Sequence, residues 1–241
     1  MRSGVRKIYL VRQDDLAGIP TADEHILKTH LKAFSLPELI VTLTVIVILL
    51  VLLVQGTARS RRFSKRTQCV ENLKHIGLAF RLSTLLSGDQ YSMKIPTNNG
   101  GSMEYLAIPG STFRHFVLLS NEIEKTELLV CPADSRPPAA RFDQVSETNI
   151  SYFVGVDAQE TLPEVWLAGD RNVLTNGFQF INGLMVLQTN GLAGWNKGIH
   201  KQCGNVGMGD GSVHGFDNAG LHNSMIKALK AYNETQRLSL P

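Results

Sequence analysis

Apolar residues form one long, nearly unbroken run near the start of the chain, at residues 34–54. As a helix this run would be roughly 31 Å long at about 1.5 Å per residue, enough to cross a bilayer core of about 30 Å. One carboxylate, Glu38, lies near its start. A carboxylate inside a membrane costs free energy and needs a partner. We therefore predict a transmembrane helix over 34–54, with Glu38 as a functional residue and residues 1–33 as a polar cytoplasmic leader.

Hydrophobic residues continue beyond this run at the spacing of a helix with one apolar face. The recurring positions are Phe63, Val70, Leu73, Ile76 and Phe80. Arg66, Lys74 and Arg81 fall away from this stripe. The pattern predicts that the same helix extends over residues 55–87, where its outer half packs against a globular head.

From residue 88 to residue 241 the pattern changes to short elements separated by many turns. Runs rich in β-branched and aromatic residues predict strands; they lie at 128–131, 150–156, 165–168 and 184–188. Residues 206–208 and 213–216 flank Asp210-Gly211, a strong hairpin signal. Residues 113–119 fit a short helix or a strand, and the spacing of apolar residues over 221–232 predicts a C-terminal helix. The expected fold is α+β, with the long helix packed onto a small antiparallel sheet.

Composition and charge exclude few functions. The chain has 241 residues, of which 43% are hydrophobic and 19% charged, an ordinary globular mixture once the apolar run is set aside. The formal net charge of +3 is too small to indicate a nucleic-acid protein. A basic cluster follows the apolar run; it consists of Arg59, Arg61, Arg62, Lys65 and Arg66. On its own, this cluster favours a cytoplasmic head; it also fits a solvated helix face.

The cysteines are odd in number, at positions 69, 131 and 203, and none forms a CxxC pair. A zinc site of the CxxC type is therefore unsupported. If the head lies outside the cytoplasm, one disulfide and one free thiol become possible. Cys69 with Cys131 is the pair that we expect.

Pro37 restricts where the helix can begin. Inside a continuous helix, its ring would clash with the carbonyl of Ala33 and one backbone hydrogen bond would be missing. Cleavage between Ala33 and Phe34 would remove that carbonyl and place Pro37 in the first turn, where N–H groups have no helical partner. The cut would also free an amine on Phe34 that could pair with Glu38 of a neighbouring subunit. The alternatives are a plain anchor whose Glu38 reaches the headgroups, and signal-peptide cleavage after Ala58, which fits poorly because the apolar run is too long.

The sequence from Phe34 to Val41, FSLPELIV, resembles the amino-terminal motif of type IV pilins and type II secretion pseudopilins. The resemblance implies that a prepilin peptidase cuts between Ala33 and Phe34, that Phe34 becomes N-methylated, and that Glu38 guides assembly. The family usually has glycine before the cut, where this chain has Ala33.

Later segments are similar to a subgroup of pseudopilin-like proteins with an H-x9-DG signature, which His200 and Asp210-Gly211 match. Residues 69–77, 131–134 and 167–172 also resemble segments of this subgroup. The motifs identify the subgroup without defining any chemistry. Asp210-Gly211 and residues 170–172 are equally what tight turns need, so a structural role is the expectation for His200 and Asp210.

The resemblance implies a structural subunit of a secretion pseudopilus or pilus-like filament, and not an enzyme. The implied partners are a prepilin peptidase, other pilin-like subunits and an inner-membrane assembly platform driven by an ATPase. The implied location is the bacterial inner membrane, with a single crossing and the head outside the cytoplasm. Some pseudopilins hold calcium, for which Asp170, Asn172 and Asp210 are the candidates here; otherwise no cofactor is expected. A second hypothesis is an anchored protein of the cell envelope whose head binds a polymer or an ion.

Overall fold

The computed structural model describes residues 35–85, 88 and 90–241, apart from the side chains of residues 53–59 and 62. The predicted leader and the predicted cleavage site between Ala33 and Phe34 lie outside the described residues. The chain divides into two units, one ending at Leu52 and the other beginning at Leu53, and each is described by itself.

The first unit contains the start of helix α1 (Leu36–Thr84). The Ser35 carbonyl accepts the first helical hydrogen bond, from Leu39 N–H at 3.1 Å. Glu38 Oε2 accepts weak bonds from Ser35 N–H at 3.4 Å and from Ser35 Oγ at 3.3 Å. This Ser-x-x-Glu arrangement is one half of a capping box, which sets the helix start. Pro37 is then the second helical residue, where its missing N–H costs nothing.

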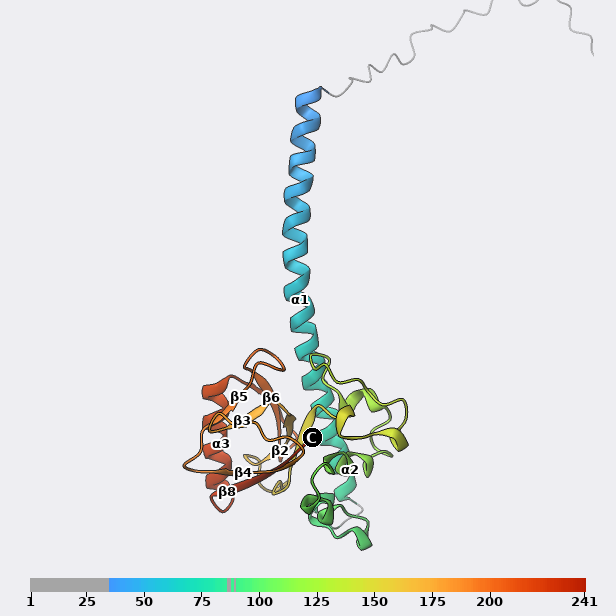
Figure 1. Cartoon of the computed structure of the whole chain (residues 1–241), viewed down its shortest axis with the longest axis vertical. Helices are drawn as coiled ribbons and strands as arrows, with labels where there is room; N and C mark the ends of the chain where they lie inside the picture. The colour runs from blue at the N-terminus through green and yellow to red at the C-terminus, as the bar shows by residue number, and fades with distance from the viewer. Residues whose placement is uncertain (1–34, 86–87, 89) are drawn as a thin grey trace, which may run out of the picture. The chain divides into compact units, whose positions relative to one another are not determined.

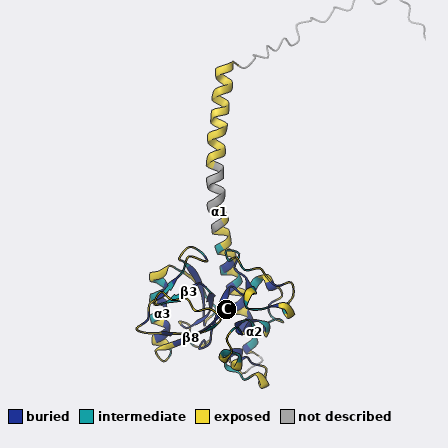
Figure 2. Cartoon of the chain, viewed as in Figure 1, coloured by how far each residue is buried: buried dark blue, intermediate teal, exposed yellow. Residues whose placement is uncertain are grey.

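The prediction of a transmembrane helix over residues 34–54 requires correction. No helix among the described residues combines the length and the apolar character that a membrane crossing requires. The apolar side chains that the structure describes over Leu36–Leu52 are exposed in this structure (Figure 2).

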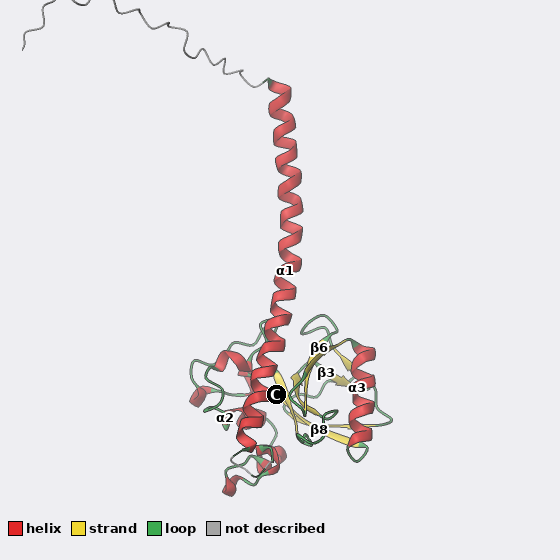
Figure 3. Ribbon diagram, turned by 180° about the vertical axis from the view of Figure 1, so that it is seen from behind, coloured by secondary structure: helices red, strands yellow, loops and turns green. Residues whose placement is uncertain are grey.

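The second unit is built on an antiparallel sheet, which has six strands within the described residues. The strands, in order across the sheet, are β4 (Gly183–Gln188), β8 (Thr235–Leu240), β1 (Tyr152–Gly155), β2 (Trp166–Asp170), β6 (Gly204–Met208) and β7 (Val213–Phe216). Strands β3 (Val173–Thr175) and β5 (Ala193–Trp195) form a separate pair. Where the structure describes this unit, its other α-helices are α2 (Thr112–Val117) and α3 (Asn218–Ala231). Figures 1 and 3 show the sheet between α1 and α3.

Two hydrophobic clusters fill the two faces of this sheet. Alternate residues of β1 face opposite sides: Tyr152 and Val154 belong to the cluster that contains α1 residues such as Ile76, whereas Phe153 belongs to the cluster that contains Met225 of α3. Leu73, Ile76 and Phe80 of the stripe predicted on the outer half of α1 are thus part of the face that covers the sheet, whereas Phe63 is 74% exposed. Short 3-10 helices complete the α1 side; they are η2 (Ser92–Lys94), η3 (Thr97–Asn99), η4 (Met103–Ala107), η5 (Thr126–Leu129), η6 (Phe142–Gln144) and η7 (Glu147–Asn149).

Two parts of the predicted head differ from the structure. The strand expected at 128–131 is absent from the described fold; the segment forms the turn η5, and its carbonyls are bonded by Ser151 N–H and by the Asn72 side chain. The chain also continues past the helix expected near its end, because α3 is followed by β8. Strand β8 lies between β4 and β1, inside the sheet.

Candidate metal centre

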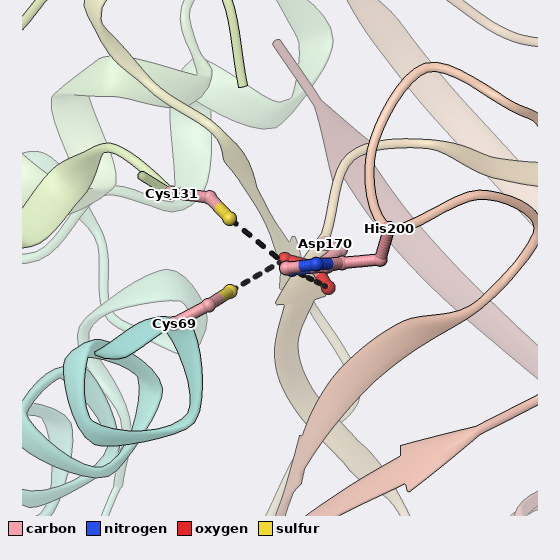
Figure 4. A group of neighbouring side chains, drawn as sticks. All are labelled: Cys69, Cys131, Asp170 and His200. Atoms are coloured by element: carbon pink, nitrogen blue, oxygen red, sulfur yellow. Dashed lines mark hydrogen bonds and ion pairs between the residues drawn. The ribbon is translucent and has the colours of Figure 1, made fainter. Parts of the chain in front are cut away.

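Four side chains from distant parts of the sequence meet in the interior of the second unit (Figure 4). Cys69 comes from α1, Asp170 from the end of β2, Cys131 from the segment after η5, and His200 from the loop between β5 and β6. Their ligand atoms all lie within 4.8 Å of one another. Cys69, Cys131 and Asp170 are fully buried, and the His200 side chain is 5% exposed. The described residues thus contain a group that could hold a metal ion.

The contacts inside this group converge on one small volume. Cys69 Sγ donates to Asp170 Oδ1 at 3.0 Å. Nε2 of His200 lies 3.2 Å from Cys131 Sγ and 3.7 Å from Asp170 Oδ2. Cys69 and Cys131, the pair expected to form a disulfide, are brought together here as free thiols. Whether they oxidise to a disulfide stays a prediction.

Neighbouring polar groups hold two of the four candidate ligands, Asp170 and Cys69, in place. Asp170 Oδ2 accepts hydrogen bonds from the Asn205 backbone N–H at 2.7 Å and from Asn205 Nδ2 at 3.0 Å. The Tyr152 hydroxyl donates to Cys69 Sγ at 3.5 Å. Partners of this kind fix the orientation of ligand atoms before any ion arrives.

The segment that carries Cys131 is fastened by an ion pair. Asp134 accepts two hydrogen bonds from the Arg171 guanidinium, at 2.7 and 2.8 Å. The Ser151 hydroxyl donates to the same carboxylate at 2.8 Å. Because Arg171 directly follows Asp170, this pair ties the Cys131 segment to the strand that carries the carboxylate ligand.

The loop that carries His200 is fastened by Asn172. Its Nδ2 donates to the carbonyls of Asn196, Ile199 and Cys203, at 3.2, 3.1 and 3.4 Å. His200 itself has a positive φ of 52°, and the next two residues are also left-handed. Residues other than glycine adopt this conformation uncommonly. The bonds from Asn172 and a bond of 3.3 Å from the Gln202 N–H to the Asn196 carbonyl restrain the loop.

Burial and mutual contact shift the acidities in the group. Burial and the nearby Cys131 raise the pKa of Asp170 to about 7. Hydrogen bonding to Cys69 and contact with His200 lower the pKa of Cys131 to about 5. Burial raises the pKa of Cys69 far above its usual range. Burial acts to lower the pKa of His200, but Cys131 and Asp170 outweigh it and raise that pKa. Of the two thiols in this group, Cys131 is therefore the readier to act as a thiolate, which is the form that binds metals.

The geometry differs from that of a cysteine-histidine-aspartate catalytic triad. In such a triad the acid orients the histidine through the ring nitrogen that faces away from the nucleophile. Here Cys131 and Asp170 both face Nε2 of His200. Groups that point at one common spot are typical of ligands around an ion.

Of the three residues that the sequence offered as calcium ligands, one belongs to this centre, one supports it and one lies outside it. Asp170 is a member, and Asn172 supports the His200 loop. Asp210 lies in the turn between β6 and β7, where its carboxylate accepts the Ser212 N–H at 2.9 Å. The meeting of His200 with the two cysteines was missed, although all four ligands lie in segments that the resemblance had singled out.

A basic cleft opens beside the centre, with a volume of about 760 Å³. His200 and Phe63 line it together with four cationic residues; these are Lys65, Arg66, Lys197 and Lys201. His200 is therefore the ligand through which the buried centre reaches solvent.

Comparisons of the chain with protein-family models, curated proteins and solved structures found no match.

Proposed function

We propose that the chain is a pilin-like structural subunit of a type II secretion pseudopilus or a type IV pilus-like filament. The observation that carries this proposal is the apolar surface of α1 over Leu36–Leu52. Large hydrophobic side chains there are 49 to 73% exposed. An apolar surface of this kind needs a cover, and a bundle of like helices from neighbouring subunits supplies one.

Glu38 is the proposed assembly residue. It lies in the first turn of α1, and its contacts with Ser35 are long, at 3.3 and 3.4 Å. A carboxylate enclosed by apolar helices requires a charged or hydrogen-bonding partner. After cleavage between Ala33 and Phe34, the methylated amine of Phe34 on an adjacent subunit would be that partner.

The proposal implies specific protein partners and a location of the head outside the cytoplasm. A prepilin peptidase would process the chain, and other pilin-like subunits would pack against its helix. An inner-membrane platform with a cytoplasmic ATPase would drive assembly, with the head outside the cytoplasm. The role is mechanical, with no substrate to be turned over.

Mass spectrometry of the mature amino terminus tests this function. We expect a chain that begins at N-methylated Phe34. Native material that retains residues 1–33 where the prepilin peptidase is active would overturn the proposal.

A charge-removing variant tests the assembly step separately. Glu38→Gln should be processed normally but should enter filaments poorly. The matched control is Glu71→Gln, which removes an exposed carboxylate from the same helix within the second unit. Equal incorporation of both variants would show that Glu38 has no pairing role.

Calcium is not the ion that the buried group favours. Two of the four donors are thiols, whereas Ca²⁺ takes six to eight oxygen ligands. Asp210, one of the residues expected for calcium, lies in a turn outside the group.

A second candidate function is that of an envelope-side binding protein, which the basic cleft favours. Four cationic residues around one cleft suit an anionic polymer. The double variant Lys197→Glu/Lys201→Glu should then lose salt-sensitive binding to polygalacturonate, whereas Lys227→Glu on α3 should retain it. Absence of salt-sensitive binding by the unaltered chain would remove this candidate.

A further inference from the structure

We propose that Cys69, Cys131, Asp170 and His200 bind one Zn²⁺ ion that fastens α1 to the sheet. Zinc in proteins is held tetrahedrally, with bonds of about 2.3 Å to sulfur and about 2.0 Å to nitrogen or oxygen. A tetrahedron with such bonds separates its ligand atoms by roughly 3.3 to 3.8 Å. Cys131 Sγ and His200 Nε2 are 3.2 Å apart, and Asp170 approaches Cys69 Sγ with Oδ1 at 3.0 Å and His200 Nε2 with Oδ2 at 3.7 Å. With one ligand atom from each residue, no pair is more than 4.8 Å apart, so the widest pair would have to close by about 1 Å to complete the site.

The donor set selects the ion. Thiolate and imidazole ligands suit zinc, whereas calcium and magnesium require oxygen. Four protein ligands fill a tetrahedral shell, so the site would be closed and structural, with no position left for a substrate. Zinc would displace the protons that the ligand side chains still carry, including the thiol proton of Cys69, and these protons would pass to solvent.

The surroundings meet the further requirements of a metal site. Each carboxylate oxygen of Asp170 already faces another ligand, and Asn205 holds Oδ2 with two hydrogen bonds. Tyr152 similarly donates to Cys69. An orientating second layer of this kind is expected of a real site.

The proposed ion has a structural consequence. Its ligands come from one helix, one strand and two loops, so the site forms only in the folded chain. An ion that binds the folded state alone stabilises it by mass action. Removal of zinc should therefore lower the melting temperature, on the order of 10 °C for a domain of this size.

The test begins with the full chain, purified under reducing conditions and supplied with zinc. Elemental analysis should find one zinc per chain. Replacement by Co²⁺ should give thiolate-to-cobalt charge-transfer absorption together with the strong visible bands of a tetrahedral ion. A folded chain that holds no stoichiometric zinc or cobalt would overturn the proposal. So would native material, isolated without reductant, in which Cys69 and Cys131 form a disulfide.

Variants assign the ligands. Cys131→Ser and His200→Gln should lose the metal, and Asp170→Asn should bind cobalt more weakly while the thiolate band persists. The control is Cys203→Ser, which removes the cysteine outside the group and should retain one zinc. Metal retained in full by Cys131→Ser, or lost with Cys203→Ser, would contradict the assignment. If a ligand variant fails to fold, the cobalt spectrum and chelator-dependent melting of the unaltered chain still decide the question.

Discussion

The ion pair between Arg171 and Asp134 should contribute strongly to the stability of the head. The Asp134 side chain is 1% exposed and that of Arg171 is 19% exposed. In Arg171→Met the carboxylate stays buried without its counter-charge, and breaking a buried pair from one side costs about 3 to 5 kcal/mol. Ser151 Oγ and the Ser135 N–H would still donate to Asp134. We therefore expect the low end of that range, about 3 kcal/mol.

Urea unfolding of the full chain, followed by tryptophan fluorescence, measures this loss. Trp166 and Trp195 are both buried in the cluster beside α3 and report on unfolding of the head. A loss of about 3 kcal/mol corresponds to a melting temperature lower by roughly 6 to 12 °C.

A double variant separates the ion pair from simple loss of packing. Asp134→Asn combined with Arg171→Met removes both charges, so it should be more stable than the sum of the single changes predicts, by about 2 kcal/mol. Strictly additive losses, or a loss below about 1 kcal/mol in Arg171→Met, would refute the reasoning.

The contribution of Asp134 to folding stability should decrease as the pH falls. Burial opposes ionisation of Asp134, but Arg171 and Ser151 outweigh it, so the pKa of this carboxyl lies below its usual value in the folded chain. A depressed carboxyl pKa contributes stability above the unfolded value of about 3.9, and that stability is lost as the pH falls through the folded value. In Arg171→Met the acid limb of the stability profile should begin at a higher pH.

Three further predictions concern the core. Burial lowers the pKa of His115 from 6.5 to about 4. Stability should therefore fall by up to about 3 kcal/mol as the pH drops through this interval, and His115→Gln should flatten that slope in denaturant titrations. Phe80→Ala should cost about 3 to 5 kcal/mol in the same titrations, because the buried ring packs edge-on against Tyr91 and Phe116; no loss would show that the α1 interface is not formed. Gly169→Ala should destabilise the sheet by about 1 to 3 kcal/mol, since the new Cβ would lie 2.6 Å from the Phe153 ring, whereas Gly177→Ala has open space around it and tests only the strain of a positive φ.

Much of the fold follows from local patterns in the sequence. The apolar stripe through Leu73, Ile76 and Phe80 correctly predicts a helix with one buried face. The hairpin at Asp210-Gly211 and the strands near Phe153 and Leu167 are also confirmed. In these segments the local preference agrees with what tertiary packing requires.

The errors lie where local pattern and tertiary context disagree. A short apolar run such as 128–131 fits a buried strand or a buried turn equally well, and here no strand of the described fold lies beside it. Strand β8 was missed because its first three residues, Thr235 to Arg237, are all polar and because it follows a helix that looked terminal. Its pairing with β4 and β1 depends on chain segments far away in sequence.

The candidate metal centre also depends on tertiary contacts that local sequence patterns do not predict. Each ligand could be named from the sequence, and Asp170 was named as a metal candidate. Their meeting could not be inferred, because the four ligands come from separate segments and no CxxC spacing marks them. Only the packing of α1 on the sheet brings Cys69 to Asp170.

Residues 170–172 connect the separate motifs into one arrangement. From the sequence these three residues fit a turn held by side-chain hydrogen bonds, and the structure gives each a different task. Asp170 faces the other ligands, Arg171 holds the segment of Cys131 through Asp134, and Asn172 holds the loop of His200. A change at Arg171 should therefore disturb the Cys131 side of the centre, and a change at Asn172 the His200 side. The short motifs that are separate along the chain thus contribute to one site: they supply the four candidate ligands or the hydrogen bonds that position them.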